Sequence, residues 1–315
     1  MKRLLFAAAM ALAASVLILA VGCDLDPPKD DYEPKENEVF VSVADPAAKS
    51  PIAKELGGRI VGDRNRALAP TTWAEVSVFS ASGLPTGHAD LAEKDGKWEG
   101  YVQVSEAGAM TFSVCGGAVA NQVTWVGSGT LTVSGTGQNL AIQADIPAIG
   151  DMGPAGGLIF HDKGSYSDGW RYLEASPVES SGYLMWSSTR DTLTGTSDRS
   201  IGAGKSNTDW IMATGNESQF PAAWYCANLE YNGATDWFLP SRDEIVAMRT
   251  NLGHTAFLHP DGEAYWSSYW SSTERTALDG GTDAAYYMYT TPWETSDGPA
   301  FKDNKDLYVK AARRF

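Results

Sequence analysis

The strongest constraint on the fold is a series of short alternating segments between residues 73 and 146. Apolar and polar side chains alternate in AEVSVFSA, KWEGYVQV, AMTFSV and TLTVSG, and turn signals such as Asp95-Gly96 separate these segments. Side chains of a strand point alternately to the two faces of a sheet, so a period of two predicts strands with one buried face. Regularly spaced strands without a helix-length segment predict an all-β immunoglobulin-like sandwich over residues 39–148.

The N-terminal segment differs from the rest of the chain. Three residues with two positive charges are followed by an apolar run that ends at Gly22, and Cys23 comes next. This order predicts a signal peptide over residues 1–22, although the run is nearly long enough for the alternative, a transmembrane helix. The stretch resembles the lipobox of bacterial lipoproteins, with Ala20 where the family prefers Leu. The resemblance implies that Cys23 is acylated and anchors the chain to a membrane.

Composition limits the partners. Residues 23–38 combine prolines with dense acidic charge, so they predict a tether without a core of its own. The formal net charge of −15 argues against nucleic acid as a ligand and against adhesion to anionic lipid headgroups. Besides Cys23, the chain holds Cys115 and Cys226. We expect these two to be buried free thiols, while export would also permit a disulfide between them.

Glycine-rich and aromatic motifs in the second half of the chain carry a family resemblance. Their order and spacing are similar to those of the Lcl C-terminal domain family of bacterial secreted and lipid-anchored proteins. The motifs are Gly153-Pro154-Ala155-Gly156-Gly157, Asp236-Trp237-Phe238-Leu239-Pro240-Ser241, Tyr269-Trp270-Ser271-Ser272-Thr273 and Arg313-Arg314-Phe315. The segment WFLPSRDEI also resembles a helix start in formylglycine-generating-enzyme-type folds. The resemblance implies a C-type-lectin-like domain over residues 149–315. The expected fold class is therefore α+β: this domain preceded by the sandwich.

Local signals place two helices and one turn in this part. Ser241 followed three residues later by Glu244 is a capping box, and Gly253 ends the helix that it predicts. A second helix is predicted from Pro221 to Asn232-Gly233. The segment GAGKS at 202–206 resembles the end of a phosphate loop but lacks the required preceding glycine, so it predicts a glycine-rich surface turn.

Nothing in the sequence predicts catalysis, a cofactor or a metal site. Formylglycine-generating enzymes use a pair of cysteines late in the domain, and this chain has no cysteine after Cys226. The histidines at 161, 254 and 259 lack the spacing of HExxH, and the nucleophile elbow Gly-x-Ser-x-Gly is absent. We therefore expect a protein that is not an enzyme.

The aromatic residues divide into expected core and expected surface. Five tryptophans are assigned to the core of the second domain: Trp170, Trp186, Trp210, Trp224 and Trp237. The repeat YWSSYWSSTE at 265–274 predicts a strand with Trp270 in the core and Trp266 exposed before it. In the following strand, AAYYMYTT, the resemblance implies that Tyr286 and Met288 point inward. Alternation then sends Tyr287 and Tyr289 to the opposite face.

The loops around these strands predict a ligand-binding surface. Rigid aromatic residues beside adaptable polar loops are the composition of an antibody paratope. The predicted contacts are Trp266, Arg275, Asp279, Asp283, Tyr287, Tyr289, Trp293 and Glu294. Because the chain is acidic, a protein or a neutral glycan suits this surface better than a polyanion.

These observations favour a lipid-anchored, surface-exposed binding protein, adhesin- or receptor-like, at the outer membrane or cell surface. The C-terminal stretch is also similar to that of variable lipoproteins of diversity-generating retroelements, which implies a diversified zone over residues 266–302. The alternative is a structural envelope lipoprotein that binds no ligand and uses its second domain as a cap or a subunit contact.

Overall fold

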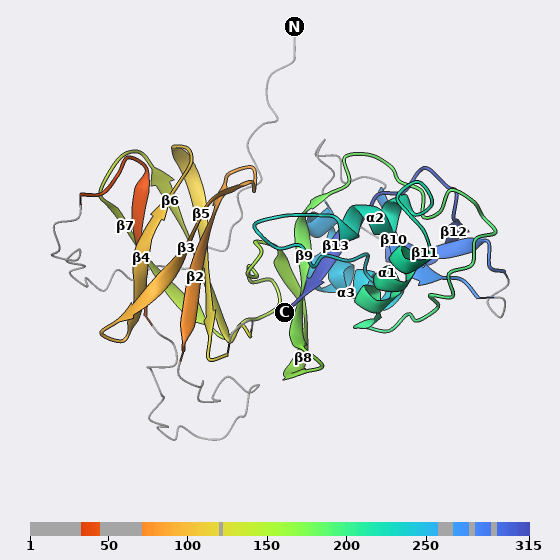
Figure 1. Ribbon diagram of the computed structural model, residues 1–315, viewed down its shortest axis with the longest axis horizontal. Coiled ribbons are helices and arrows are strands. Elements are labelled where there is room, and N and C mark those ends of the chain that lie inside the picture. Colours follow the sequence, from red (N-terminus) through yellow and green to blue (C-terminus); the bar gives the residue numbers. More distant parts are fainter. Residues whose placement is uncertain (1–32, 45–70, 120–121, 258–266, 277–280, 291–294) are drawn as a thin grey trace, which may run out of the picture. The chain divides into compact units, whose positions relative to one another are not determined.

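Seven strands in the first half of the chain form a closed barrel (Figure 1). The computed structural model describes residues 33–44, 71–119, 122–257, 267–276, 281–290 and 295–315. The barrel strands are β1 (Glu38–Ala44), β2 (Trp73–Ser80), β3 (Pro85–Lys94), β4 (Lys97–Gln103), β5 (Gly108–Gly117), β6 (Trp125–Val133) and β7 (Gln138–Asp145).

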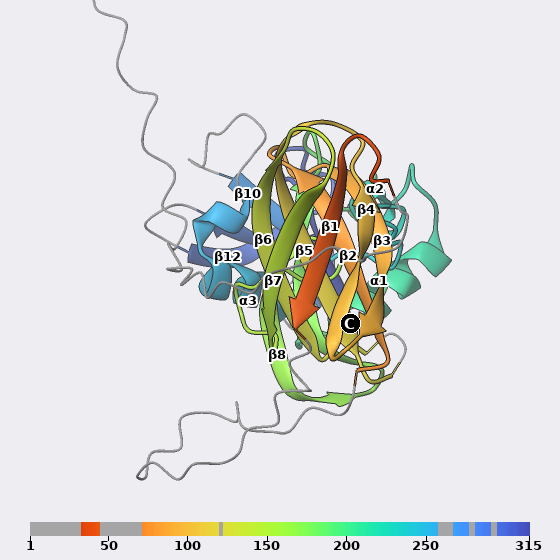
Figure 2. The ribbon, with the colours of Figure 1, turned by 90° about the vertical axis from the view of Figure 1, so that its left-hand side faces the viewer.

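The barrel closes through its first and last strands. Neighbouring strands follow the order β1-β4-β3-β2-β5-β6-β7. Strand β1 pairs antiparallel with β4, with Val41 opposite Gly100, and parallel with β7, with Val41 opposite Leu140. Figure 2 shows β1 between β7 and β4. Because the barrel closes, β1 has a hydrogen-bonded neighbour on each side and is not an edge strand.

The predicted immunoglobulin-like sandwich is therefore wrong. The strands lie where the alternation predicted them, but they form one continuous hydrogen-bonded cycle instead of two stacked sheets. Both architectures bury one face of every strand, so both produce the same period of two in the sequence. The difference is the parallel pairing of β1 with β7, which alternation does not encode.

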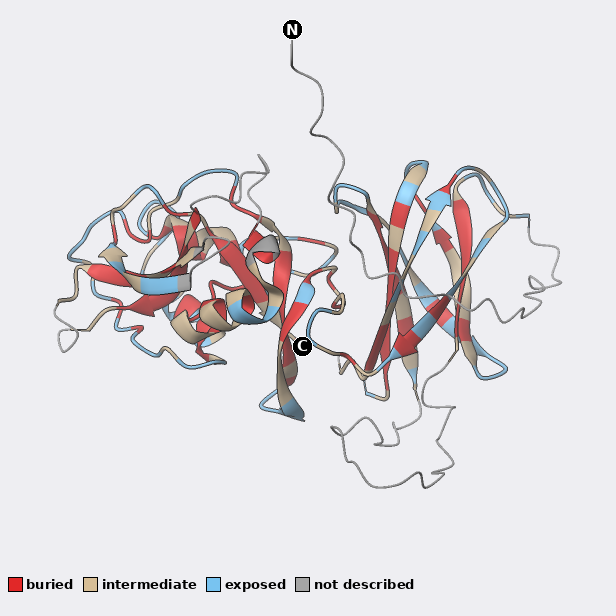
Figure 3. Ribbon diagram, turned by 180° about the vertical axis from the view of Figure 1, so that it is seen from behind, coloured by how far each residue is buried: buried red, intermediate tan, exposed pale blue. Residues whose placement is uncertain are grey.

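The apolar side chains of the alternating segments point inward and fill the barrel interior. Val76 and Val78 of β2 and Phe112 of β5 are fully buried in this core. Figure 3 shows the buried stretches of the barrel strands in red. Trp125, also fully buried, lies opposite Gly116 in the register of β5 and β6. A Cβ atom at Gly116 would lie 2.3 Å from the Trp125 ring, so the close approach of this ring requires glycine.

The C-terminal part contains two three-stranded sheets and three short helices among the described residues. One sheet has the order β13-β9-β8 and the other the order β10-β11-β12. The strands are β8 (Leu158–Ser167), β9 (Trp170–Glu179), β10 (Ser267–Glu274), β11 (Ala284–Thr290), β12 (Thr295–Phe301) and β13 (Lys310–Arg314). The helices are α1 (Ala203–Thr214), α2 (Pro221–Ala227) and α3 (Arg242–Leu252), and the 3-10 helix η1 covers His254–Phe257.

The predicted fold class, α+β with a C-type-lectin-like domain, is also wrong. The described chain is mostly β, and its helices have only 12, 7 and 11 residues. The helices are short because stop signals lie close to their starts. Gly202, with a φ of 99°, precedes α1 and Gly215 follows it, while α3 lies between its N-cap Ser241 and its C-cap Gly253.

The structure confirms the predicted start of α3 and contradicts the turn predicted at residues 202–206. The capping box of α3 is confirmed, because Ser241 Oγ accepts from the amide of Glu244 and the Glu244 carboxylate accepts from the amide of Ser241. The segment GAGKS at 202–206 is not a surface turn but the start of α1, with Gly204 buried against Glu244. Within the described ranges, no helix is both long and apolar enough to cross a bilayer.

Both faces of the sheet β10-β11-β12 are covered. Trp270 is fully buried, as predicted, and Tyr287 packs beside its core cluster. Tyr269 and Met288 point the other way into a second cluster, so the alternation predicted for β11 is confirmed. Of the five tryptophans assigned to the core, three are buried, but Trp210 is 63% exposed and Trp224 is half-buried.

Cys115 and Cys226 are free and buried, which confirms the expectation for both. Burial raises the pKa of each thiol well above its usual value, and at Cys115 the neighbouring Glu75 raises it further.

Two buried carboxyl groups make stability depend on pH. Burial raises the pKa of Glu174 to about 7, although Arg313 partly opposes the shift. Burial likewise raises the pKa of Glu244 to about 7, against the effect of its bonds to backbone amides. Between the unfolded-state pKa of about 4.3 and pH 7, the folded state keeps protons that the unfolded chain has lost. The contribution of these groups to stability is therefore full below about pH 4.3 and is lost as pH rises through about 7.

We predict that the Glu174→Gln variant loses less stability between pH 5 and pH 8 than the wild type. The difference in the free energy of unfolding should be roughly 2–3 kcal/mol, because the variant removes one group that must ionise in the fold. Urea unfolding at both pH values measures this, with the exposed Glu217→Gln as the control. Equal pH dependence in wild type and Glu174→Gln would show that Glu174 does not titrate in this range.

Candidate functional site

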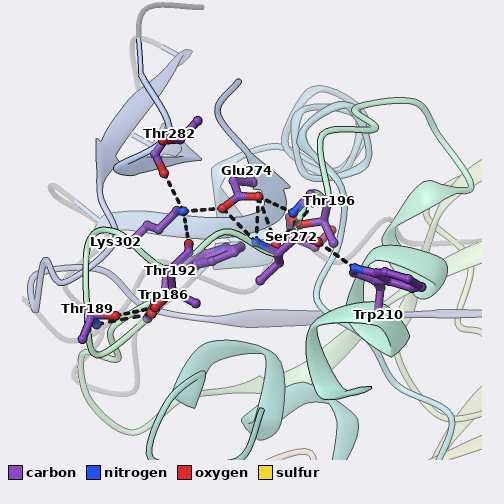
Figure 4. Close-up of polar contacts among 12 residues, drawn as sticks. Trp186, Thr189, Thr192, Thr196, Trp210, Ser272, Glu274, Thr282 and Lys302 are labelled. Atoms are coloured by element: carbon purple, nitrogen blue, oxygen red, sulfur yellow. Dashed lines mark hydrogen bonds and ion pairs between the residues drawn. The ribbon is translucent and has the colours of Figure 1, made fainter. Parts of the chain in front are cut away.

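A buried lysine organises the C-terminal part (Figure 4). Lys302 is fully buried, and its Nζ donates to the carbonyl oxygens of Thr192 and Thr282, both at 2.6 Å. The same atom forms an ion pair with Oε1 of Glu274, the last residue of β10. It also lies 5.2 Å from the ring centroid of the buried Trp186. The ammonium group thus joins the end of β10 to two loops.

The carboxylate of Glu274 fixes the loop over residues 187–200. Its Oε2 accepts from the amide of Gly195 at 2.6 Å and from both the amide and the hydroxyl of Thr194 at 3.1 Å. The backbone of the same loop pairs with β10, since the amide of Glu274 donates to the Thr196 carbonyl at 2.8 Å. We call Trp186, Thr192, Thr194, Glu274 and Lys302 the hub.

An exposed tryptophan is attached to the hub. Trp210 of α1 has the most exposed side chain among the large hydrophobic residues described, at 63%. Its indole N–H nevertheless donates to the Thr194 carbonyl at 2.6 Å, which fixes the orientation of the ring (Figure 4). Leu193, next to Thr194, is also exposed. An aromatic ring held in place while facing solvent is suited to act as a preorganised contact.

A second exposed aromatic residue directly precedes Lys302. Phe301, at the end of β12, is half exposed, and the guanidinium of Arg190 lies 4.1 Å from its ring centroid. Arg190 donates to Asp303 at 2.7 Å, so the cation above the ring is itself held. Both exposed rings therefore adjoin residues that the hub fixes.

Two arginines enclose the ring of Tyr286 on β11. Arg199 donates to the Tyr286 hydroxyl at 2.7 Å, and its guanidinium lies 4.5 Å from the ring centroid. Arg242, at the start of α3, lies 5.8 Å from that centroid and donates to Asp297 and Asp243. Burial tends to lower the pKa of Arg242, but the bonds to these two aspartates raise it overall. This cluster ties α3 to β11 and β12.

The structure brings some of the predicted contact residues to the hub and separates others. The amide of Arg275 donates to the Ala284 carbonyl, and the Asp283 carbonyl accepts from the amide of Lys302. Tyr289 lies near the other end of β11, six residues from Asp283 or roughly 20 Å along an extended strand. Tyr287 packs against the core cluster that contains Trp270. The remaining predicted contacts, Trp266, Asp279, Trp293 and Glu294, lie outside the described residues, as does Cys23.

Sequence reasoning missed Trp210 and Phe301. The helical period would not have identified Trp210 as exposed, although the buried residues of α1 include Ala203, Asn207 and Ile211. Position 210 is three residues from 207 and seven from 203, so a helix places it at the edge of the same face. The three-dimensional structure was needed to show that this ring is exposed.

Comparison with known proteins finds similarity to one solved structure and to no protein family. No family model matches the sequence, and no curated protein matches it. Among solved structures, the chain is similar to a fimbrial protein from Bacteroides ovatus ATCC 8483. The identity is 10%, the TM-score is 0.39, and the match covers 89% of this chain and 71% of that chain. A similarity at this level supports no conclusion about function.

We predict that Lys302→Met destabilises the protein by about 3–5 kcal/mol, because it leaves the Glu274 carboxylate buried without its cation. Adding Glu274→Gln should restore part of the loss, so the double variant should cost less than the sum of the single variants. Chemical unfolding of the four proteins measures the coupling.

The exposed pair Arg190–Asp303 provides the control, since its side chains are 50% and 34% exposed. Arg190→Met should cost at most about 1 kcal/mol. A Lys302→Met variant that costs no more than Arg190→Met would contradict the role assigned to the hub.

Proposed function

We propose that this chain is a lipid-anchored surface protein that binds a protein or a neutral glycan, in the manner of an adhesin or receptor, and that it is not an enzyme. The observation that carries the proposal is the side chain of Trp210, which is 63% exposed and yet fixed by its bond to Thr194. The proposed ligand surface comprises Trp210, Leu193 and Phe301 together with the C-terminal loops.

Preorganisation supports a binding role. A ring whose orientation is already fixed loses little conformational entropy when a ligand covers it. Tryptophan and arginine are also the residues most enriched among those that dominate binding energy. Here Arg190 is held over Phe301 by Asp303, so this pair too is ordered before any ligand arrives.

The charges support a protein or neutral glycan over a polyanion. The formal net charge is −15. The arginines that flank the proposed surface are paired with carboxylates, Arg190 with Asp303 and Arg242 with Asp297. A polyanionic ligand would meet an acidic protein whose nearby cations are already neutralised, and repulsion between like charges would weaken its binding.

We further propose that residues 266–302 form a diversified zone, as in variable lipoproteins of diversity-generating retroelements. Glu274 and Lys302 lie within this zone and are buried in the hub. Diversification must therefore spare these two positions while changing exposed neighbours such as Phe301. A near-copy of the 3′ end of the gene beside a reverse transcriptase gene, with codons for Glu274 and Lys302 unchanged among variants, tests this idea.

The second candidate function is that of a structural envelope lipoprotein, with the C-terminal part as a cap or subunit contact. The exposed apolar side chains of Trp210 and Leu193 are compatible with a permanent contact as well as with a ligand. A monomeric protein in solution that binds a ligand from an array would favour the first candidate over this one.

We predict that Cys23 is acylated. Metabolic labelling with an alkyne fatty acid should mark the wild-type protein in cells and leave Cys23→Ala unlabelled, because the lipid requires the thiol of Cys23. Cys226→Ser is the control and should label normally. Equal labelling of Cys23→Ala and wild type would show that Cys23 does not carry the lipid.

We predict that Trp210→Ala weakens binding of a ligand found on glycan or protein arrays by about 30-fold or more, the loss typical of a dominant contact. Stability should fall by at most about 1 kcal/mol, because the variant loses one hydrogen bond and little buried surface. Affinity and thermal melting are measured together.

Tyr166→Ala is the matched control, since it removes an exposed aromatic side chain from the hairpin between β8 and β9. It should leave binding unchanged. Unchanged binding in Trp210→Ala would show that the ligand surface lies elsewhere.

A further inference from the structure

Three side chains capable of holding a metal meet on the outer face of the barrel. Glu75 lies on β2, directly opposite Asp90 of β3 in the register, and His88 lies two residues before Asp90 on the same face. One ligand atom from each of the three lies within 4.8 Å of the others. Their neighbours Val76 and Ala89 point into the barrel core, so strand alternation keeps the three groups outside.

The ring of His88 is oriented for ligation. Its Nδ1 lies 3.1 Å from Oγ of Ser77, while Nε2 faces Glu75, 3.9 Å from Oε2. Histidines that hold metals usually donate the N–H of the other ring nitrogen to a polar group, which fixes the tautomer. When Nε2 holds a metal, Nδ1 carries the proton and donates it to the hydroxyl of Ser77.

The carboxylate of Glu75 is oriented in the same way. Its Oε1 accepts a hydrogen bond from the buried thiol of Cys115 at 3.3 Å. Its Oε2 is the oxygen that faces His88. Hydrogen bonds to a ligating carboxylate from outside the metal site are a common feature of protein metal centres. Each of these two ligands is thus held by one neighbour while its free atom points toward the cluster.

We propose that Glu75, His88 and Asp90 bind a divalent transition-metal ion, represented by Zn²⁺. Two ligands at about 2.0–2.1 Å in a tetrahedral site lie roughly 3.3 Å apart. The 3.9 Å between His88 and Glu75, and the 4.8 Å within which all three ligand atoms lie, therefore require the side chains to rotate toward the ion. The imidazole favours Zn²⁺ over Ca²⁺, which prefers six or more oxygen ligands. Three protein ligands leave a position for water or for a group of another molecule.

An ion pair alone explains the arrangement less well. The contact between His88 and Glu75 is long for a salt bridge, and the side chains are 51% and 29% exposed, so its contribution to stability is small. A simple ion pair also gives no role to Asp90, which brings a second carboxylate to the same imidazole. A cation between the three groups accounts for all of them.

The test is calorimetric titration of the purified full-length chain with ZnCl₂, followed by CaCl₂ in a separate run. We expect one Zn²⁺ per chain and no comparable binding of Ca²⁺. His88→Ala, Glu75→Gln and Asp90→Asn should each weaken Zn²⁺ binding by about 100-fold or more, because loss of a ligand exceeds the 10–100-fold effect of losing an outer hydrogen bond. Cys115→Ser should weaken binding less than any of these.

Matched controls are His161→Ala on β8 and Cys226→Ser on α2, which should bind Zn²⁺ like the wild type. Thermal melting of each variant confirms that it folds, and a rise in the wild-type melting temperature with Zn²⁺ that His88→Ala lacks supports the site. The proposal is overturned if Zn²⁺ does not bind or binds His88→Ala as well as wild type. It is equally overturned if Ca²⁺ binds as tightly as Zn²⁺.

Discussion

The C-terminal part depends on how the charge of Lys302 is satisfied. A buried ammonium group has three protons to donate, and they are matched by the carbonyls of Thr192 and Thr282 and by the Glu274 carboxylate. Removing both charges from water costs several kcal/mol, so the pair is stable only if its hydrogen bonds are complete. The loop over residues 187–200 supplies the remaining donors, through the amides of Thr194 and Gly195. The conformation of that loop and the burial of the ion pair therefore require each other.

The proposed binding surface is held in place because the buried ion pair fixes the loop beneath it. Thr194 donates to the Glu274 carboxylate through its amide and hydroxyl, and it orients Trp210 through its carbonyl. Farther along the loop, Arg199 bonds Tyr286, and Arg242 connects the same ring to Asp297 of β12. Short polar contacts thus connect an irregular, glycine-containing loop to a helix on one side and to a sheet on the other. A surface built on such a loop can present aromatic residues that lose little conformational entropy when a ligand binds.

The positions of strands and helices could be predicted from the sequence, but the closure of the barrel could not. Alternation located the barrel strands, and Ser241 with Glu244 located α3, because each signal depends on neighbours in the chain. The pairing of β1 with β7 joins strands almost one hundred residues apart in the sequence, and nothing in their local patterns specifies it. The same limit explains the expected sandwich, which shares its local patterns with a barrel. The expected C-type-lectin-like domain was inferred from a resemblance of short motifs, and such motifs do not specify how distant strands pair.

The candidate site was predictable only in part, for the same reason. Arg275 and Asp283 were expected at the ligand surface because they lie in polar loops, and both lie beside the hub. The hub joins residues that are far apart in the sequence, among them Thr192, Glu274 and Lys302, and none of these three stands out in the sequence. A lone lysine or glutamate is usually exposed, so only the three-dimensional structure shows these two buried against each other.

Hydrogen exchange measured by mass spectrometry tests the central claim most directly. In the wild type, the amides of Thr194 and Gly195 donate to a buried carboxylate, so peptides covering residues 187–200 should exchange about as slowly as those of β10. In Lys302→Met, the same loop should exchange much faster while the barrel strands keep their protection. Rapid exchange of this loop in the wild-type protein would contradict the account, because the ion pair would then not hold it.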